Sequence, residues 1–236
     1  MPGRFSLYQD LTVEENLIFF ATVFDTTIEE NYDLIKDIYE QIKPFNDRRA
    51  GKLSGGMKQK LGLCCALIHK PKVLFLDEPT TGVDVVSRKE FWEMLEKLKK
   101  QGITIIVSTP YMDEATLCDR IALIQNGSIM SIDTPDNIIK NFPKTLFAAK
   151  SDNIYKLLKD LRKNAGVESC YPFGEYLHLT LKADNTDALS VMRIAGEENI
   201  TGLDVKVITP TIEDSFIRLL NEYNSDEAIN EKSNGK

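Results

Sequence analysis

Apolar residues recur at helical spacing in three stretches near the start of the chain. Residues 10–24 begin with Asp10 and Thr12 as candidate caps, and residues 31–43 carry apolar side chains on one face. Residues 52–69 change from a loop into a helix with a buried stripe. This pattern predicts three amphipathic helices.

A run of consecutive apolar residues, 73–76, comes next. Such a run predicts a strand covered on both faces, as in a parallel sheet. A helix over residues 87–101 and a second strand over residues 103–108 complete a strand–helix–strand unit. The first part of the chain is therefore predicted to be α/β.

The next segment predicts smaller elements. Asp113 and Glu114 are expected to cap a short helix over residues 112–118. Two strands follow, joined at Asn126-Gly127, a pair suited to a type I′ turn. Pro135, just inside a helix start, predicts a further helix.

From residue 145 the pattern becomes one of short strands and helices. Strands are predicted at residues 147–149, 170–172, 177–181 and 205–208, and helices at residues 154–162 and 188–197. The order β-α-β-β-α-β predicts a small ferredoxin-like α+β appendage. Residues 221–236 are polar and predict a disordered tail. The predicted domains are thus residues 1–144, 145–220 and 221–236.

Composition excludes several classes of protein. The 236 residues carry a net charge of −7, which argues against a nucleic-acid partner because phosphate contacts need clustered Lys and Arg. No apolar run reaches the ~18–20 residues of a membrane span, and the start, MPGRFSLYQD, does not predict a cleavable signal. The four cysteines show no CxxC spacing, so neither a zinc site nor a disulfide framework is predicted.

Two motifs carry candidate chemistry. Residues 53–59, LSGGMKQ, join a loop to a helix, where glycines and the helix N-terminus favour an anion; a plain helix cap is the alternative. Asp77 and Glu78 end the apolar strand, where ligands bind in α/β sheets. One carboxylate can hold Mg²⁺ and the other can act as a general base, whereas solvated turn acids are the alternative.

The segments LSGGMKQ, VLFLDEPTTGVD and STPYMDEA together resemble the ATP-binding cassette (ABC) ATPase family, collinearly from residue 1 to about 140. The resemblance implies a partial P-loop NTPase sheet with a helical subdomain, and ATP and Mg²⁺ as cofactors. The region after residue 145 is similar to the C-terminal region of cassettes that serve ABC-2-type exporters.

The resemblance also implies roles for single residues. The signature, which clamps the γ-phosphate of ATP held by the opposite subunit, corresponds to Leu53, Ser54, Gly55, Gly56 and Gln59. Asp77 resembles the Walker B residue that orders Mg²⁺, and Glu78 resembles the catalytic base. The D-loop, which crosses the dimer interface, corresponds to Gly82, Val83 and Asp84.

Three departures from the family pattern stand out. The 236 residues contain no Walker A motif, GxxxxGK[ST]. Gly3 occupies the Q-loop glutamine position and Pro110 the switch histidine position, and neither can supply the usual side-chain contact. We therefore expect the chain to be the C-terminal part of a longer ABC ATPase, N-terminally truncated, with no measurable ATPase activity alone.

The resemblance predicts the ATP-hydrolysing subunit of an exporter, peripheral at the cytoplasmic face of the inner (plasma) membrane. Its partners would be membrane permease subunits and a second ABC ATPase domain, in a homo- or heterodimer. One alternative is a catalytically inert regulatory half-cassette that donates its signature to a partner's ATP site. A non-transport ABC protein acting on ribosomes or DNA is disfavoured by the acidic charge.

Overall fold

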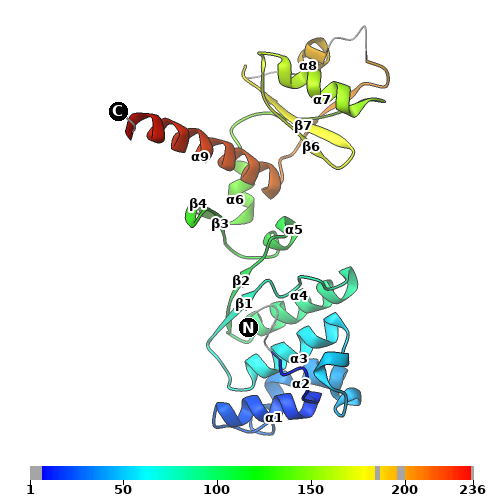
Figure 1. The fold of residues 1–236 in the computed structure, drawn as a ribbon, viewed down its shortest axis with the longest axis vertical. Helices are drawn as coiled ribbons and strands as arrows, with labels where there is room; N and C mark the ends of the chain where they lie inside the picture. The colour runs from blue at the N-terminus through cyan, green and yellow to red at the C-terminus, as the bar shows by residue number, and fades with distance from the viewer. Residues whose placement is uncertain (1–6, 184–186, 196–199, 235–236) are drawn as a thin grey trace. The chain divides into compact units, whose positions relative to one another are not determined.

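The computed structural model describes residues 7–183, 187–195 and 200–234. The chain divides into two compact units, Met1–Leu117 and Cys118–Lys236, each described here by itself (Figure 1). The predicted limits, residues 1–144 and 145–220, differ from this division. Contacts of the helix at the C-terminus with residues 128–140 account for the difference, because they tie those residues to the second unit.

The first unit is built from helices packed beside a short parallel sheet. Its elements are α1 (Val13–Val23), α2 (Tyr32–Ile42), η1 (Lys43–Phe45), η2 (Ala50–Lys52), α3 (Gly55–Leu67), β1 (Val73–Asp77), α4 (Val85–Lys100), β2 (Thr104–Ser108) and α5 (Met112–Ala115). The predicted helices and the strand–helix–strand unit are confirmed.

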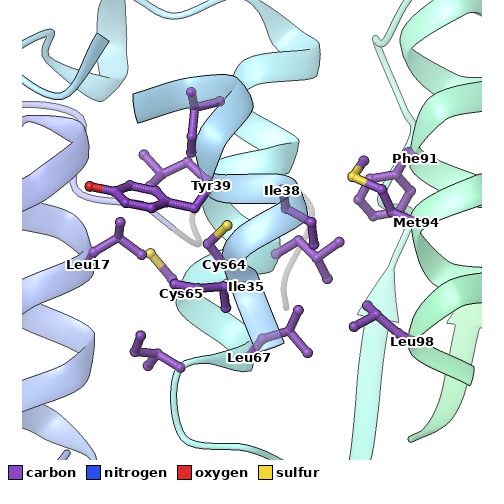
Figure 2. Close-up of a cluster of buried hydrophobic side chains, with 14 of the residues drawn as sticks. Leu17, Ile35, Ile38, Tyr39, Cys64, Cys65, Leu67, Phe91, Met94 and Leu98 are labelled. Carbon is purple, nitrogen blue, oxygen red and sulfur yellow. The ribbon is translucent and has the colours of Figure 1, made fainter. Parts of the chain in front are cut away.

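Helix α3 is the centre of the first unit's core, since it packs against α1, α2 and α4. Figure 2 shows Cys64 and Cys65 of α3 among apolar side chains of α1 and α2, with Phe91 on α4 nearby. Burial raises the pKa of both thiols well above the ordinary value. These cysteines are therefore inert core residues rather than nucleophiles.

Strands β1 and β2 are parallel, in a register that runs from Val73 opposite Thr104 to Asp77 opposite Ser108. Leu74 and Leu76 are buried on one face of β1, while Val73 and Phe75 are 43% and 61% exposed on the other. The expectation of a strand covered on both faces is therefore wrong within the described residues.

The second unit begins with a hairpin and a short helix. These are β3 (Ile121–Gln125), β4 (Ser128–Asp133) and α6 (Pro135–Lys140). Asn126 and Gly127 both have positive φ, as the predicted type I′ turn requires. Thr134 accepts a hydrogen bond from Asn137 N and caps α6, with Pro135 at its first position.

The rest of the second unit is the predicted β-α-β-β-α-β arrangement. It comprises β5 (Leu146–Lys150), α7 (Ile154–Lys163), β6 (Val167–Phe173), β7 (Tyr176–Leu181), α8 (Ala188–Ala195) and β8 (Asp204–Ile208). The sheet is antiparallel, with strand order β6-β7-β5-β8, and α7 and α8 contribute side chains to its core. The predicted end of the second helix, residues 196–197, lies outside the described residues.

Helix α9 (Ile212–Asn234) corrects the prediction of a disordered tail from residue 221. Neither proline nor glycine interrupts this segment, and Arg218 pairs with Glu222 one turn later. The helix therefore continues into the polar stretch. Across the described residues, no helix combines the length and apolar character needed to cross a membrane.

Candidate functional site

The segment that resembles the signature lies at the N-terminus of helix α3. Ser54 is the N-cap and accepts a hydrogen bond of 3.3 Å from Met57 N, with Leu53 buried just before it. Ser54 and Gly55 are exposed, so the helix N-terminus and the serine hydroxyl face solvent. Gln59 is half-buried, and its Oε1 finds no hydrogen-bond partner among the described residues.

The two glycines of this segment lie close to the segment that resembles the D-loop and to the first turn of helix α4, which follows it. A Cβ added at Gly55 would lie 3.2 Å from Gly82 O. A Cβ added at Gly56 would lie 2.5 Å from Ser87 Oγ and 2.7 Å from Ser87 Cβ, closer than real Cβ atoms approach. Gly55 therefore packs the signature against the D-loop segment, and a side chain at position 56 would force Ser87 to move.

The D-loop segment is shaped by three residues in succession. Gly82 has a φ of +75°, a conformation that suits glycine, and Val83 is buried. Asp84 caps helix α4, with its Oδ1 accepting a 2.9 Å hydrogen bond from Ser87 N. That backbone hydrogen bond lowers the pKa of Asp84, so the carboxylate stays ionised at neutral pH.

Asp77 and Glu78 lie at the carboxyl end of β1, as predicted, and both are exposed. Asp77 Oδ1 accepts a 2.6 Å hydrogen bond from Ser108 Oγ on β2. Glu78 N donates to Ser108 O at 2.9 Å, and Glu78 Oε2 accepts from Thr81 Oγ1 at 3.1 Å. The two carboxylates are thus held by different partners and can do different chemistry.

These carboxylates fit Mg²⁺ only if water and substrate phosphates supply the other ligands of the ion. The described residues contain no cluster of three or more metal-ligating side chains. Mg²⁺ is commonly held by one or two carboxylates together with water and substrate phosphates. Asp77, an exposed oxygen ligand fixed by Ser108, suits that arrangement.

The switch position is placed directly after β2. Pro110 is exposed there and has no side-chain donor, while Tyr111 N donates to Thr109 Oγ1 at 3.1 Å. The Arg88 guanidinium lies over the Tyr111 ring, with its Cζ atom 4.1 Å from the ring centroid. Gly3, the predicted Q-loop position, lies outside the described residues.

The main feature missed by sequence reasoning is Glu114, which was expected to cap α5. The α5 N-cap, Tyr111, makes no side-chain capping bond, and Glu114 is instead buried at 1% exposure. Its carboxylate accepts hydrogen bonds from Thr80 Oγ1 at 2.6 Å and from Thr109 Oγ1 at 2.7 Å. Its burial could not be read from an acidic pair in a short helix, since such pairs are usually exposed.

Comparison with known proteins decides the family. The sequence pattern of the ABC transporter family matches residues 2–81. The daunorubicin resistance ATP-binding protein DrrA2 of Streptomyces coeruleorubidus is 32% identical over 230 residues, which cover 93% of this chain and 70% of that protein. The chain belongs to the ABC transporter family.

Other relatives of this ABC chain agree. The "Probable multidrug ABC transporter ATP-binding protein YbhF" of Escherichia coli (strain K12) is 38% identical over 93% of this chain and 38% of that protein. The Nod factor export ATP-binding protein I of Burkholderia lata is 41% identical over 60% of this chain and 47% of that protein. The chain thus spans less than half the length of these two relatives.

A solved structure supports the fold. An ATP-binding subunit of an ABC transporter superposes with a TM-score of 0.51 and 27% identity, over 58% of each chain. Together with the mixed helices and strands, this similarity confirms the α/β fold of ABC ATPases. The reported relatives are named as transporter ATP-binding proteins, which does not favour a regulatory half-cassette.

Proposed function

We propose that this chain is part of the ATP-binding and ATP-hydrolysing subunit of an ABC exporter, which couples ATP binding and hydrolysis to transport. The packing of Gly55 against the D-loop segment, and of Gly56 against Ser87 in the helix that follows it, carries the proposal, because a phosphate-clamping surface needs the signature and D-loop segments fixed together. Relatives named for multidrug transport, Nod factor export and daunorubicin resistance support the export direction.

The signature surface binds ATP held by a second ABC ATPase domain. Ser54 offers its hydroxyl and the exposed N-terminus of α3 offers backbone N–H groups to the γ-phosphate. The 236 residues contain no GxxxxGK[ST] segment, so they do not supply the phosphate contacts of that motif.

The strand-end carboxylates divide the hydrolytic work. Asp77, oriented by Ser108, would hold Mg²⁺, and Glu78 would accept a proton from the attacking water as general base. Bound Mg²⁺ would neutralise charge on the transferred phosphoryl group. Pro110 cannot reach the γ-phosphate with a side-chain donor, so this chain senses nucleotide without the usual switch side chain.

A membrane permease is the second partner, with the subunit peripheral at the cytoplasmic face of the plasma membrane. Helix α1 and its C-cap support this partner, since they expose four large apolar side chains, Ile18, Phe19, Val23 and Phe24. Exposed apolar surface of this kind is typical of protein interfaces.

Glu78→Gln tests the function directly. The complex that carries the tagged chain would be isolated from membranes of the source cells, and its ATP hydrolysis measured. Loss of a general base typically lowers the rate 10²–10⁴-fold, and we expect a loss of about 100-fold or more. The measurement is kcat with saturating Mg²⁺ and ATP.

Glu93→Gln is the matched control, since it removes an exposed carboxylate from helix α4 without touching the site. The control should keep its rate within about twofold, as surface substitutions usually do. Equal rates for the Glu78→Gln and unaltered complexes, or a complex without any ATPase activity, would contradict the proposal.

A further inference from the structure

The turn after β1 holds Glu78 in a strained conformation. Its φ is +44°, in the left-handed region that residues with a Cβ rarely adopt. Such a conformation persists only where the surroundings hold it in place. The direct restraints on Glu78 include its backbone hydrogen bond to Ser108 O and its side-chain hydrogen bond from Thr81.

A buried carboxylate extends these restraints to the rest of the turn. Thr80, at 1% exposure, donates its hydroxyl to Glu114 Oε1. The backbone of the same turn is closed by Thr81 N donating to Glu78 O at 3.2 Å and Val83 N donating to Thr80 O at 3.1 Å. Thr80 thus anchors the middle of the turn between Glu78 and the D-loop segment.

The same carboxylate contacts two other segments of the site. Glu114 Oε2 accepts from Thr109, which lies between Ser108 and Pro110 in the switch segment. Arg88 Nε, on the helix that follows the D-loop, lies 3.5 Å from Glu114 Oε1 in an ion pair. Because burying a carboxylate is costly unless its oxygens are hydrogen-bonded, this convergence strongly disfavours rearrangement.

We propose that Glu114 is a positioning residue whose buried carboxylate clamps the strained turn after β1 to the switch segment and to helix α4, and so fixes the direction of the Glu78 side chain. The importance of Glu78 as a base rests on the proposed function, whereas the clamp is a property of the folded chain. In this chain the switch position carries Pro110, and the clamp links the switch segment to the strand-end carboxylates, Asp77 and Glu78.

Glu114→Gln tests the clamp by amide hydrogen exchange of the full chain, followed by NMR. The amide keeps the size of the side chain but replaces one acceptor oxygen with a donor. We expect exchange at the amides of Glu78, Thr81 and Val83 to accelerate about tenfold or more, through local opening. Amides of Asn16 and Phe24, hydrogen-bonded at the two ends of α1, should keep their rates.

Asp113→Asn is the matched control, because Asp113 is the neighbouring carboxylate near the same Arg88 but is 77% exposed. It should leave all of these rates within about twofold of those in the unaltered chain.

Two substitutions of Thr80 test the other end of the clamp. Thr80→Val removes the hydroxyl and should accelerate the three amides, and Thr80→Ser should restore slow exchange.

Unchanged exchange at the three amides in Glu114→Gln would overturn the clamp. Equal acceleration throughout the first unit would also overturn it, since that pattern marks a loss of overall stability. If Glu114→Gln does not fold, the Thr80→Val and Thr80→Ser comparison decides the matter. The experiment contains no nucleotide, so its outcome is independent of the Glu78→Gln hydrolysis test.

Discussion

At the scale of single residues, Gly56 shows how tightly the signature surface is packed. Its position on α3 faces the first turn of α4, where Ser87 occupies the space that a side chain would need. Glycine is otherwise unfavourable inside a helix by about 1 kcal/mol relative to alanine. The residue therefore lowers helix propensity but permits the close approach of two segments.

Gly56→Ala should destabilise the chain by about 1 kcal/mol, because overpacking costs about 1–3 kcal/mol and the gain in helix propensity offsets about 1 kcal/mol of that. Urea unfolding measures the change. In a Ser87→Gly background the clashing atoms are absent, so the same substitution should become neutral or stabilising. A destabilisation of equal size in both backgrounds would refute this account of the contact.

The sequence predicts residues that lie in a recognisable local motif, whereas it does not predict residues whose role depends on a partner far away in the sequence. Ser54, Asp77 and Glu78 lie in segments with a distinctive sequence motif. Glu114 becomes informative only through Thr80, which is 34 positions away. Hydrophobic periodicity places elements but does not pair polar side chains across them.

At the scale of elements, the first turn of α9 is fixed to the sheet of the second unit by Asp214. This residue is fully buried, and its Oδ1 lies 2.7 Å from His178 Nδ1 on β7 and accepts a 2.8 Å hydrogen bond from Tyr171 on β6. Its Oδ2 accepts from both Thr211 N and Thr211 Oγ1 at 2.7 Å. Phe173 stacks on the His178 ring.

The same cluster makes stability depend on pH. Burial raises the pKa of Asp214, but hydrogen bonds from His178, Thr211 and Tyr171 outweigh burial and bring the pKa below its ordinary value. The ionised carboxylate therefore stabilises the fold above the unfolded-state pKa of about 3.9. That stabilisation is lost as the pH falls through the lower pKa of the folded state.

Asp214→Asn should lower the free energy of unfolding by about 1.5–3 kcal/mol at pH 7, the range for a hydrogen bond to a charged group. Urea unfolding at pH 7 and at pH 3 measures the effect, and the difference from the unaltered chain should shrink at the lower pH. Glu213→Gln, an exposed neighbour on the same turn, is the control. A difference that stays constant between the two pH values would count against the cluster.

Element order was largely predictable, because the spacing of apolar residues changes clearly between helix and strand. The extent of α9 was not, since polar composition alone does not distinguish an exposed helix from a disordered segment. Local helix propensity and the Arg218–Glu222 pair carry the helix past residue 221.

At the scale of the whole molecule, the division into two units has a clear physical origin. Ser215 on α9 donates to Ile138 O, across 77 positions of sequence, and Tyr223 contacts Ser128. Contacts at such separations could not be predicted from the local pattern, which changes character near residue 145.

In the first unit, one face of the two-stranded sheet is apolar and exposed, with Ile106 at 49% exposure.

That exposed sheet face should make the isolated chain prone to aggregation, as exposed apolar strands generally are. Ile106→Thr keeps a β-branched side chain while reducing the apolar surface, and should slow aggregation about threefold or more in light scattering at 37 °C. Val85→Thr, at a site 80% exposed on α4, should have little effect. Equal aggregation rates for the Ile106→Thr and unaltered chains would be evidence against this prediction.

The length of α9 has a practical consequence for studying the second unit. Its 23 residues extend about 34 Å at 1.5 Å per residue. A fluorophore attached after its last turn would therefore stand roughly 30 Å from Asp214 as long as the helix remains straight. Energy transfer to an acceptor on α7 would then report bending or melting of α9 without any probe inside the hydrogen-bonded cluster.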